Sequence, residues 1–171
     1  MAASRRFFLT LNCHGTNTAA FGSNVTKMNM KKVTVIEMKG LALSVVPRQW
    51  TSREMTKISL MACQLKELPI NFGSLVPELQ QLLLPHNRID KLPPTFGLLG
   101  KLVDLGLTAN RFTYIPDVIF DLSSLESLSM TNNKISTIPS SICSCKKLNA
   151  IHSESTPDSM PCALCNEKND K

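Results

Sequence analysis

The sequence has no apolar run long enough to cross a membrane, because a spanning helix needs roughly 18–20 consecutive apolar residues. Hydrophobic residues nevertheless make up 43% of the 171 residues, which is ample for a buried core. A chain of this length usually forms one domain. These features predict a single globular domain that does not enter a membrane.

Acidic residues are missing from the N-terminal part of the chain. Residues 1–32 hold 5 basic residues and no acidic residue. Residues 33–152 hold 12 basic and 9 acidic residues, and residues 153–171 hold 2 basic and 4 acidic residues. The net charge of +6 therefore comes largely from the N-terminal arm. Because nucleic-acid-binding domains carry their basic residues on a folded face, this distribution argues against nucleic acid as a partner.

No secretory signal is recognisable, since the apolar run at residues 7–11 is too short for the core of a signal peptide. An acid-free arm rich in Ser and Thr, with Arg5 and Arg6, also fits a mitochondrial transit peptide, but its apolar residues make no clean helical stripe. We expect a disordered arm over 1–32 and a cytoplasmic protein, with mitochondrial targeting as the alternative. In a reducing compartment most of the six cysteines would be free thiols.

Recognised catalytic arrangements are also missing from the sequence. No Ser/His/Asp or Cys/His set stands at a usable spacing, and no phosphate-binding loop occurs. The three histidines, His14, His86 and His152, are far apart in the chain. We therefore expect a protein that is not an enzyme and uses no cofactor.

The stretch LQQLLLPHNRIDKLP, residues 79–93, has a spacing that fits neither a helix nor a plain strand. Its apolar residues occupy positions one, four, six, eleven and fourteen, with asparagine at position nine and proline at fifteen. The register recurs along the chain, with proline at position fifteen five times, which indicates tandem repeats. We number the units one to six by their first positions, which are Val33, Met55, Leu79, Leu102, Leu125 and Leu148.

Positions four and six of each unit flank one outward residue, so each unit contributes a short strand with a period of two residues. Stacked strands form a parallel sheet, and their inward residues fill a core that no unit buries alone. The proline presets a return path outside the sheet. We expect Asn71–Leu75 and Thr95–Leu99 to form short helical turns that place a phenylalanine on the core, as Trp50 would in unit one.

This pattern resembles the intracellular leucine-rich repeat class with the unit L-x-x-L-x-L-x-x-N-x-L-x-x-L-P, which includes Ras-pathway scaffold proteins. The resemblance covers about residues 33–151. It implies an α/β fold, a curved solenoid with a short parallel β-sheet on the concave face and irregular, 3-10 or short helical turns on the convex face. It also implies a protein-binding module without catalytic residues.

In that class the asparagine at position nine bonds to backbone groups of the turns and forms a ladder from repeat to repeat. Asn87, Asn110 and Asn133 would form this ladder, and cysteine, found here as Cys63, is a known variant. Leu41 cannot hydrogen-bond through its side chain, so unit one is expected to be looser there or to act as an N-terminal cap.

Unit six loses the pattern after Ile151, and no closing cap follows it. We expect a leucine-rich repeat domain over 33–152, with about five full repeats and a partial sixth, and an irregular or disordered tail over 153–171. The missing cap favours a truncated version of a longer array, with a short irregular cap as the alternative.

The end of the chain also offers a candidate zinc site, because four thiolates can hold this metal. The spacing CxC…CxxC departs from the usual paired CxxC motifs, and the second cysteine occupies a convex apolar position that Leu75, Leu99 and Leu122 fill in other units. Buried or free thiols are therefore favoured over zinc, and a disulfide cap is expected still less without export. The four cysteines are Cys143, Cys145, Cys162 and Cys165.

Side chains that point outward from the strands would form the concave face. Its middle is expected to be apolar, and exposed apolar side chains on a rigid surface suggest a partner site. The predicted function is a monomeric scaffold or adaptor that binds a protein partner there, in intracellular signalling. The candidate binding residues are Lys57, Ser59, Met61, Gln81, Leu83, Pro85, His86, Val103, Asp104, Glu126 and Ser129.

Overall fold

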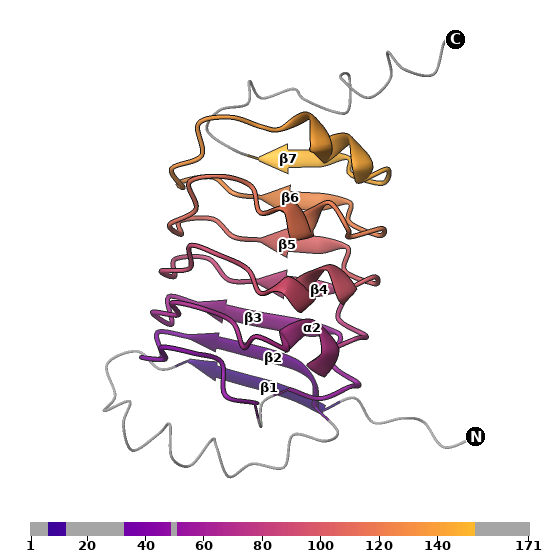
Figure 1. The fold of residues 1–171 in the computed structure, drawn as a ribbon. Coiled ribbons are helices and arrows are strands. Elements are labelled where there is room, and N and C mark those ends of the chain that lie inside the picture. Colours follow the sequence, from indigo (N-terminus) through magenta and orange to yellow (C-terminus); the bar gives the residue numbers. More distant parts are fainter. Residues whose placement is uncertain (1–6, 13–32, 49–50, 153–171) are drawn as a thin grey trace, which may run out of the picture.

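The computed structural model describes residues 7–12, 33–48 and 51–152, which stack as successive units along one axis (Figure 1). The strands follow one another in chain order in a single sheet, and every neighbouring pair is parallel. This confirms the predicted parallel sheet of a repeat solenoid. The strands are β1 (Phe7–Asn12), β2 (Val33–Lys39), β3 (Lys57–Met61), β4 (Gln81–Leu83), β5 (Asp104–Gly106), β6 (Ser127–Ser129) and β7 (Ala150–His152).

Short helical turns lie on the side of the units opposite the sheet (Figure 1). Proline at position fifteen leaves the chain extended before each 3-10 turn, with ψ of 152° at Pro93, 135° at Pro116 and 149° at Pro139. Two of these elements lie where helical turns were expected, at 71–75 and 95–99. They are the helix α2 (Phe72–Leu75) and the 3-10 helices η3 (Pro94–Leu98), η4 (Asp117–Ile119) and η5 (Ser140–Ser144).

The core lies between the sheet and these turns. Phe72 and Phe96 are fully buried there, as the register predicts, and their rings stack with centroids 6.5 Å apart. The leucines at positions four and six of units three and four are also fully buried. Each buried aliphatic side chain contributes about 1.5–3 kcal/mol relative to exposure. The predicted role of Trp50 lies outside the described residues.

The residue three places before the first position of units two to six is also buried, and this corrects one expectation. Before unit three that residue is Val76, at the end of unit two, which is fully buried, whereas Leu75 is only partly buried. The N–H of Leu79 donates to the Val76 carbonyl at 3.1 Å, as the N–H of Leu102 donates to the Leu99 carbonyl at 3.0 Å. Unit two is one residue longer than unit three, so counting from its start misplaces this position by one.

The predicted asparagine ladder is present. Asn87 accepts hydrogen bonds through Oδ1 from the N–H groups of Cys63 and Leu65, both at 3.0 Å. Its Nδ2 donates to the carbonyls of Leu60 at 2.7 Å and Leu84 at 3.0 Å. The asparagines of units four and five make equivalent contacts. Each asparagine therefore binds its own unit and the turn of the unit before it.

Unit two replaces the asparagine with Cys63, whose thiol donates to the Met61 carbonyl at 3.3 Å. Its backbone carbonyl accepts a hydrogen bond from the N–H of Leu43 at 2.8 Å, so a main-chain contact links the turns of units one and two. Leu41 is only 1% exposed and belongs to the core. Its apolar side chain adds to the buried cluster at a position where later units bury an amide.

Position eight takes a left-handed backbone in every full unit. The φ angles are 74° at Gly40, 53° at Ala62, 56° at His86, 54° at Ala109 and 55° at Asn132. Glycine and, less often, asparagine adopt this region readily, whereas alanine and histidine pay a steric cost. The conformation turns the chain between the outward residue at position seven and the buried residue at position nine.

The sheet begins earlier than the sequence indicates. β1 pairs with β2 in parallel, with an irregularity between Phe7 and Phe8, so the prediction of a disordered arm is wrong for residues 7–12. The rest of the predicted arm and the predicted tail over 153–171 lie outside the described residues. Among the described helices, none is long and apolar enough to cross a membrane.

Candidate protein-binding face

The strand register aligns outward side chains into rows across the concave face. One row places Lys57 beside Gln81 and Gln81 beside Asp104. The next row places Ser59 beside Leu83 and continues through Gly106. The structure therefore brings together seven of the predicted binding residues on strands, all of them partly exposed: Lys57, Ser59, Met61, Gln81, Leu83, Asp104 and Ser129.

Leu83 occupies the middle of this face and lies against Gly106 of the next strand. A Cβ atom added at Gly106 would lie 3.0 Å from Cδ2 of Leu83, and Gly106 is buried. A glycine in a strand often marks such a close approach. The leucine side chain thus rests across the sheet, which leaves it half-buried instead of fully exposed.

Polar groups flank this apolar centre. Toward the N-terminal units, Lys57 Nζ forms a salt bridge with Glu37 Oε1 at 2.7 Å, and both side chains are about one third exposed. Toward the C-terminal units, the hydroxyl oxygens of Thr108 and Ser129 lie 2.8 Å apart, and Thr131 donates to Thr108 at 3.3 Å. Glu37, Thr108 and Thr131 are absent from the predicted set, although the same register marks them as outward.

The remaining predicted residues lie at the margins of the face. Val103 and Glu126 precede β5 and β6, and the N–H of Glu126 donates to the Val103 carbonyl at 2.9 Å. Pro85 follows β4, and His86 is the exposed left-handed residue after it. The structure therefore does not gather these four side chains into the rows of Leu83 and Gln81.

The most exposed large apolar side chains of the described residues lie away from the concave face. Ile70 is 65% exposed, Leu98 63% and Tyr114 59%, whereas Met61 and Leu83 are only partly exposed. Ile70 follows a position-fifteen proline, and Leu98 ends η3 on the opposite side from the sheet. The sequence pattern assigns these segments to the return path and so does not predict exposed apolar groups there.

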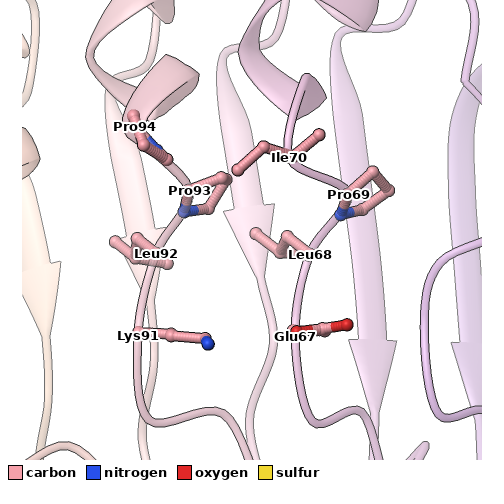
Figure 2. Close-up of a pocket in the computed structure, with 8 residues that line it drawn as sticks. All are labelled: Glu67, Leu68, Pro69, Ile70, Lys91, Leu92, Pro93 and Pro94. Atoms are coloured by element: carbon pink, nitrogen blue, oxygen red, sulfur yellow. The ribbon is translucent and has the colours of Figure 1, made fainter.

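A groove of about 570 Å³ lies beside Ile70, between the return segments of units two and three. Positions thirteen to sixteen of both units line it, as the ranges Glu67–Ile70 and Lys91–Pro94. Figure 2 shows the equivalent residues of the two segments side by side, with each leucine followed by proline. The groove therefore forms where two equivalent return segments lie next to each other.

The candidate zinc site is not assembled by the described cysteines. Cys145 is 2% exposed, and its thiol donates to the Ile119 carbonyl at 3.4 Å. Burial, and then the charge of Asp121, raise the pKa of the Cys145 thiol, which disfavours a thiolate ligand. Cys143 is disulfide-bonded, so the expectation of a free thiol is wrong for this residue.

Cys143 and Cys145 therefore do not offer the two thiolates that a zinc site of the CxC…CxxC type requires. Within the described part of the chain, no group of three or more His, Cys, Asp and Glu residues could hold a metal ion. Cys162 and Cys165 lie outside the described residues.

Comparison with known proteins agrees with this geometry. A family profile described as leucine rich repeat matches residues 100–154, which includes units four and five. Residues 100–154 of this chain therefore carry leucine-rich repeats. No curated protein matches the sequence.

Three solved structures superimpose on most of this chain. A leucine-rich repeat protein of Leptospira interrogans gives a TM-score of 0.74 at 24% identity, over 87% of this chain and 37% of that chain. Toll, from the Toll–Spatzle complex of Drosophila, gives 0.66 at 26% identity, over 84% of this chain and 20% of that chain.

The functional domain of InlJ from Listeria monocytogenes, which includes a cysteine ladder, gives a TM-score of 0.57 at 22% identity, over 72% of this chain and 26% of that chain. This chain spans less than two fifths of the length of each of these three structures. The narrower resemblance to Ras-pathway scaffold proteins stays a prediction.

Proposed function

We propose that this leucine-rich repeat protein is a non-catalytic scaffold or adaptor that binds a protein partner on its concave face, in intracellular signalling. The observation that carries the proposal is Leu83, a partly exposed leucine held against Gly106 in the middle of a parallel sheet. Apolar groups at the centre of a surface with polar surroundings are the usual anchors of protein interfaces.

The arrangement of charge and polarity supports this proposal. The Glu37–Lys57 salt bridge lies on one side of Leu83, and the hydroxyl groups of Thr108 and Ser129 lie on the other. A partner that buries an apolar side chain against Leu83 can therefore hydrogen-bond on both sides. Toll, which has the same fold, is described in complex with Spatzle. That complex is a property of Toll and supports only the general mode of binding.

The rigidity of the sheet favours binding without rearrangement. Backbone hydrogen bonds join every unit to the next, for example from the N–H of Leu84 to the Gly106 carbonyl at 2.7 Å. A preorganised surface avoids the entropic cost of ordering loops on association.

Affinity purification followed by mass spectrometry tests the proposal. Leu83→Asp and Met61→Glu place charge on the concave face, and we expect both variants to lose the partners of the wild-type protein while keeping its melting temperature. Ile70→Asp is the matched control, because it adds the same charge at an exposed apolar residue outside the face. Unchanged partners in both concave-face variants would contradict the proposal.

We further propose that the protein is a cytoplasmic monomer. Support comes from Cys63 and Cys145, whose thiols lie in the core outside any disulfide bond, while the disulfide at Cys143 favours a more oxidising compartment. Thiol alkylation in freshly lysed cells shows whether Cys143 is disulfide-bonded or reduced. A fluorescent reporter fused to residues 1–32 tests mitochondrial targeting. Mitochondrial accumulation of that reporter would overturn the cytoplasmic assignment.

A further inference from the structure

A stripe of basic residues runs along the edge where the strands end. Arg88, Arg111 and Lys134 occupy position ten of units three, four and five, directly after the ladder asparagines. Units one and two carry the uncharged residues Ala42 and Gln64 at this position. We call these three cations the strand-exit stripe.

The backbone of the strand-exit stripe is fixed by hydrogen bonds to the preceding unit. The N–H groups of Arg88, Arg111 and Lys134 donate to carbonyls of position eleven in the unit before, at 2.7, 2.8 and 2.8 Å. Neighbouring strands in a sheet lie about 4.8 Å apart, so the three Cα atoms span on the order of 10 Å. The stacking of the repeats therefore sets the spacing of the three charges.

These cations are exposed and are not neutralised by the described part of the molecule. The salt bridges among the described residues join Lys57 to Glu37 and Lys101 to Glu78, and neither involves the stripe. Positions eight to thirteen of units four and five contain no acid. The stripe thus presents unpaired positive charge along one edge.

Two features of the edge point to an acidic peptide as the ligand. Tyr114 follows Arg111 by three residues in the same unit and is 59% exposed, so an apolar ring is available on the same return segment. Arginine binds carboxylates through two parallel hydrogen bonds, a geometry suited to Asp and Glu side chains. The three cations cover only units three to five, and Glu67 and Asp90 lie at the N-terminal end of the same edge, so the positive surface suits a short acidic segment and not a long polyanion.

We propose that the strand-exit stripe binds a short acidic segment of a protein partner. An extended chain rises about 3.3 Å per residue, so about four residues cover the stripe. The carboxylates of such a segment pair with Arg88, Arg111 and Lys134, and a neighbouring apolar side chain packs on Tyr114. This site lies at the edge of the sheet and is separate from the concave face around Leu83.

Fluorescence anisotropy with a labelled peptide of four consecutive glutamates and one leucine, flanked by Gly and Ser, tests the proposal. We expect binding that weakens as salt is raised. The variant R88Q/R111Q/K134Q should bind roughly tenfold more weakly, because each exposed ion pair contributes modestly. The control R53Q/K146Q/K147Q removes equal charge from exposed residues at the opposite edge, where the chain enters the strands, and should bind as the wild type does.

Three results would overturn the proposal: no peptide binding at low salt, an equal loss in the control variant, or tighter stripe-dependent binding of single-stranded DNA or anionic vesicles. Leu83→Asp should retain peptide binding, since Leu83 is not part of the edge. Failure of the concave-face proposal and failure of this one are therefore distinguishable. Melting temperatures of all variants confirm that the surface changes leave the fold intact.

Discussion

Leu83 uses space that exists only because Gly106 has no side chain. The distance of 3.0 Å from a built Cβ of residue 106 to Leu83 Cδ2 is tighter than ordinary contact, so any larger residue shifts the leucine. The position of the exposed leucine on the concave face therefore depends on the glycine of the neighbouring strand. The glycine acts on the binding surface without being exposed itself.

Gly106→Ala is expected to displace the Leu83 side chain by a few tenths of an ångström and to weaken partner capture. The stability cost should stay below about 1 kcal/mol, because a flexible methyl group gives way, not the backbone. Gly100→Ala is the control, since its Cβ would approach only Ser123 Oγ at 4.0 Å. Pull-down efficiency and urea unfolding measure the two effects, and unchanged capture by Gly106→Ala would contradict this account.

Asn110→Ala is expected to destabilise the protein by about 3 kcal/mol, because it leaves buried backbone groups without partners. The amide of Asn110 binds the Ile89 N–H at 3.1 Å and the carbonyls of Leu84 and Leu107 at 2.9 Å. Asn133→Ala should cost less, since Asn133 is partly exposed and water can replace its bonds. Urea denaturation compares the two variants, and equal losses would argue against burial as the cause.

Ala109→Gly is expected to stabilise the protein by roughly 0.5 kcal/mol. Ala109 has φ of 54°, a conformation in which the Cβ atom of alanine is sterically strained. Glycine removes this strain, and we expect the gain to exceed the larger conformational entropy that glycine loses on folding. Ala42→Gly serves as the control, since Ala42 is exposed and is not among the positive-φ residues, so glycine there should be neutral or destabilising. The midpoints of chemical denaturation of both variants are compared with that of the wild type, and a lower midpoint for Ala109→Gly would refute the prediction.

Stability above about pH 8.5, the ordinary pKa of a thiol, should fall partly through Cys145. Burial raises the pKa of the folded thiol, so the unfolded state loses its proton first and the free energy of unfolding decreases as pH rises. The contribution is fully present below the unfolded pKa and is lost as pH rises through the folded pKa.

Cys145→Val removes this group and places the residue type of Val76 at the equivalent position of its unit. Unfolding free energies measured from pH 7 to pH 10 should fall less steeply for the variant than for the wild type. Parallel pH profiles for the two proteins would show that Cys145 does not cause the dependence.

The repeat register could be predicted because interior positions of a solenoid must be apolar and must recur. Leu82, Leu84 and Phe96 lie where the pattern places them, and the facing of Leu83 and Ser59 follows from the period of two. β1 could not be predicted in this way, because residues 7–12 carry no asparagine at position nine and no proline that would mark a unit. Pairing with β2 is visible only in three dimensions.

The parts of the site that were missed depend on contacts between units. The closeness of Leu83 to Gly106 arises across two strands, and its one signal in the sequence is the glycine within a strand position. The left-handed backbone at position eight is hidden because Ala62 and His86 rarely adopt it. The groove beside Ile70 forms from two return segments, each of which has the ordinary Leu-Pro sequence.

The ladder gives the solenoid a direction. Asn87 holds the turn that contains Cys63 and Leu65, so each turn is fastened by the unit that follows it. Loss of the unit that follows would leave main-chain groups of the turn before it unpaired, whereas loss of the unit that precedes would leave Asn87 with only the bonds to its own unit. The two ends of a shortened solenoid would therefore expose different unpaired groups, main-chain groups of a turn at the C-terminal end and an asparagine amide at the N-terminal end.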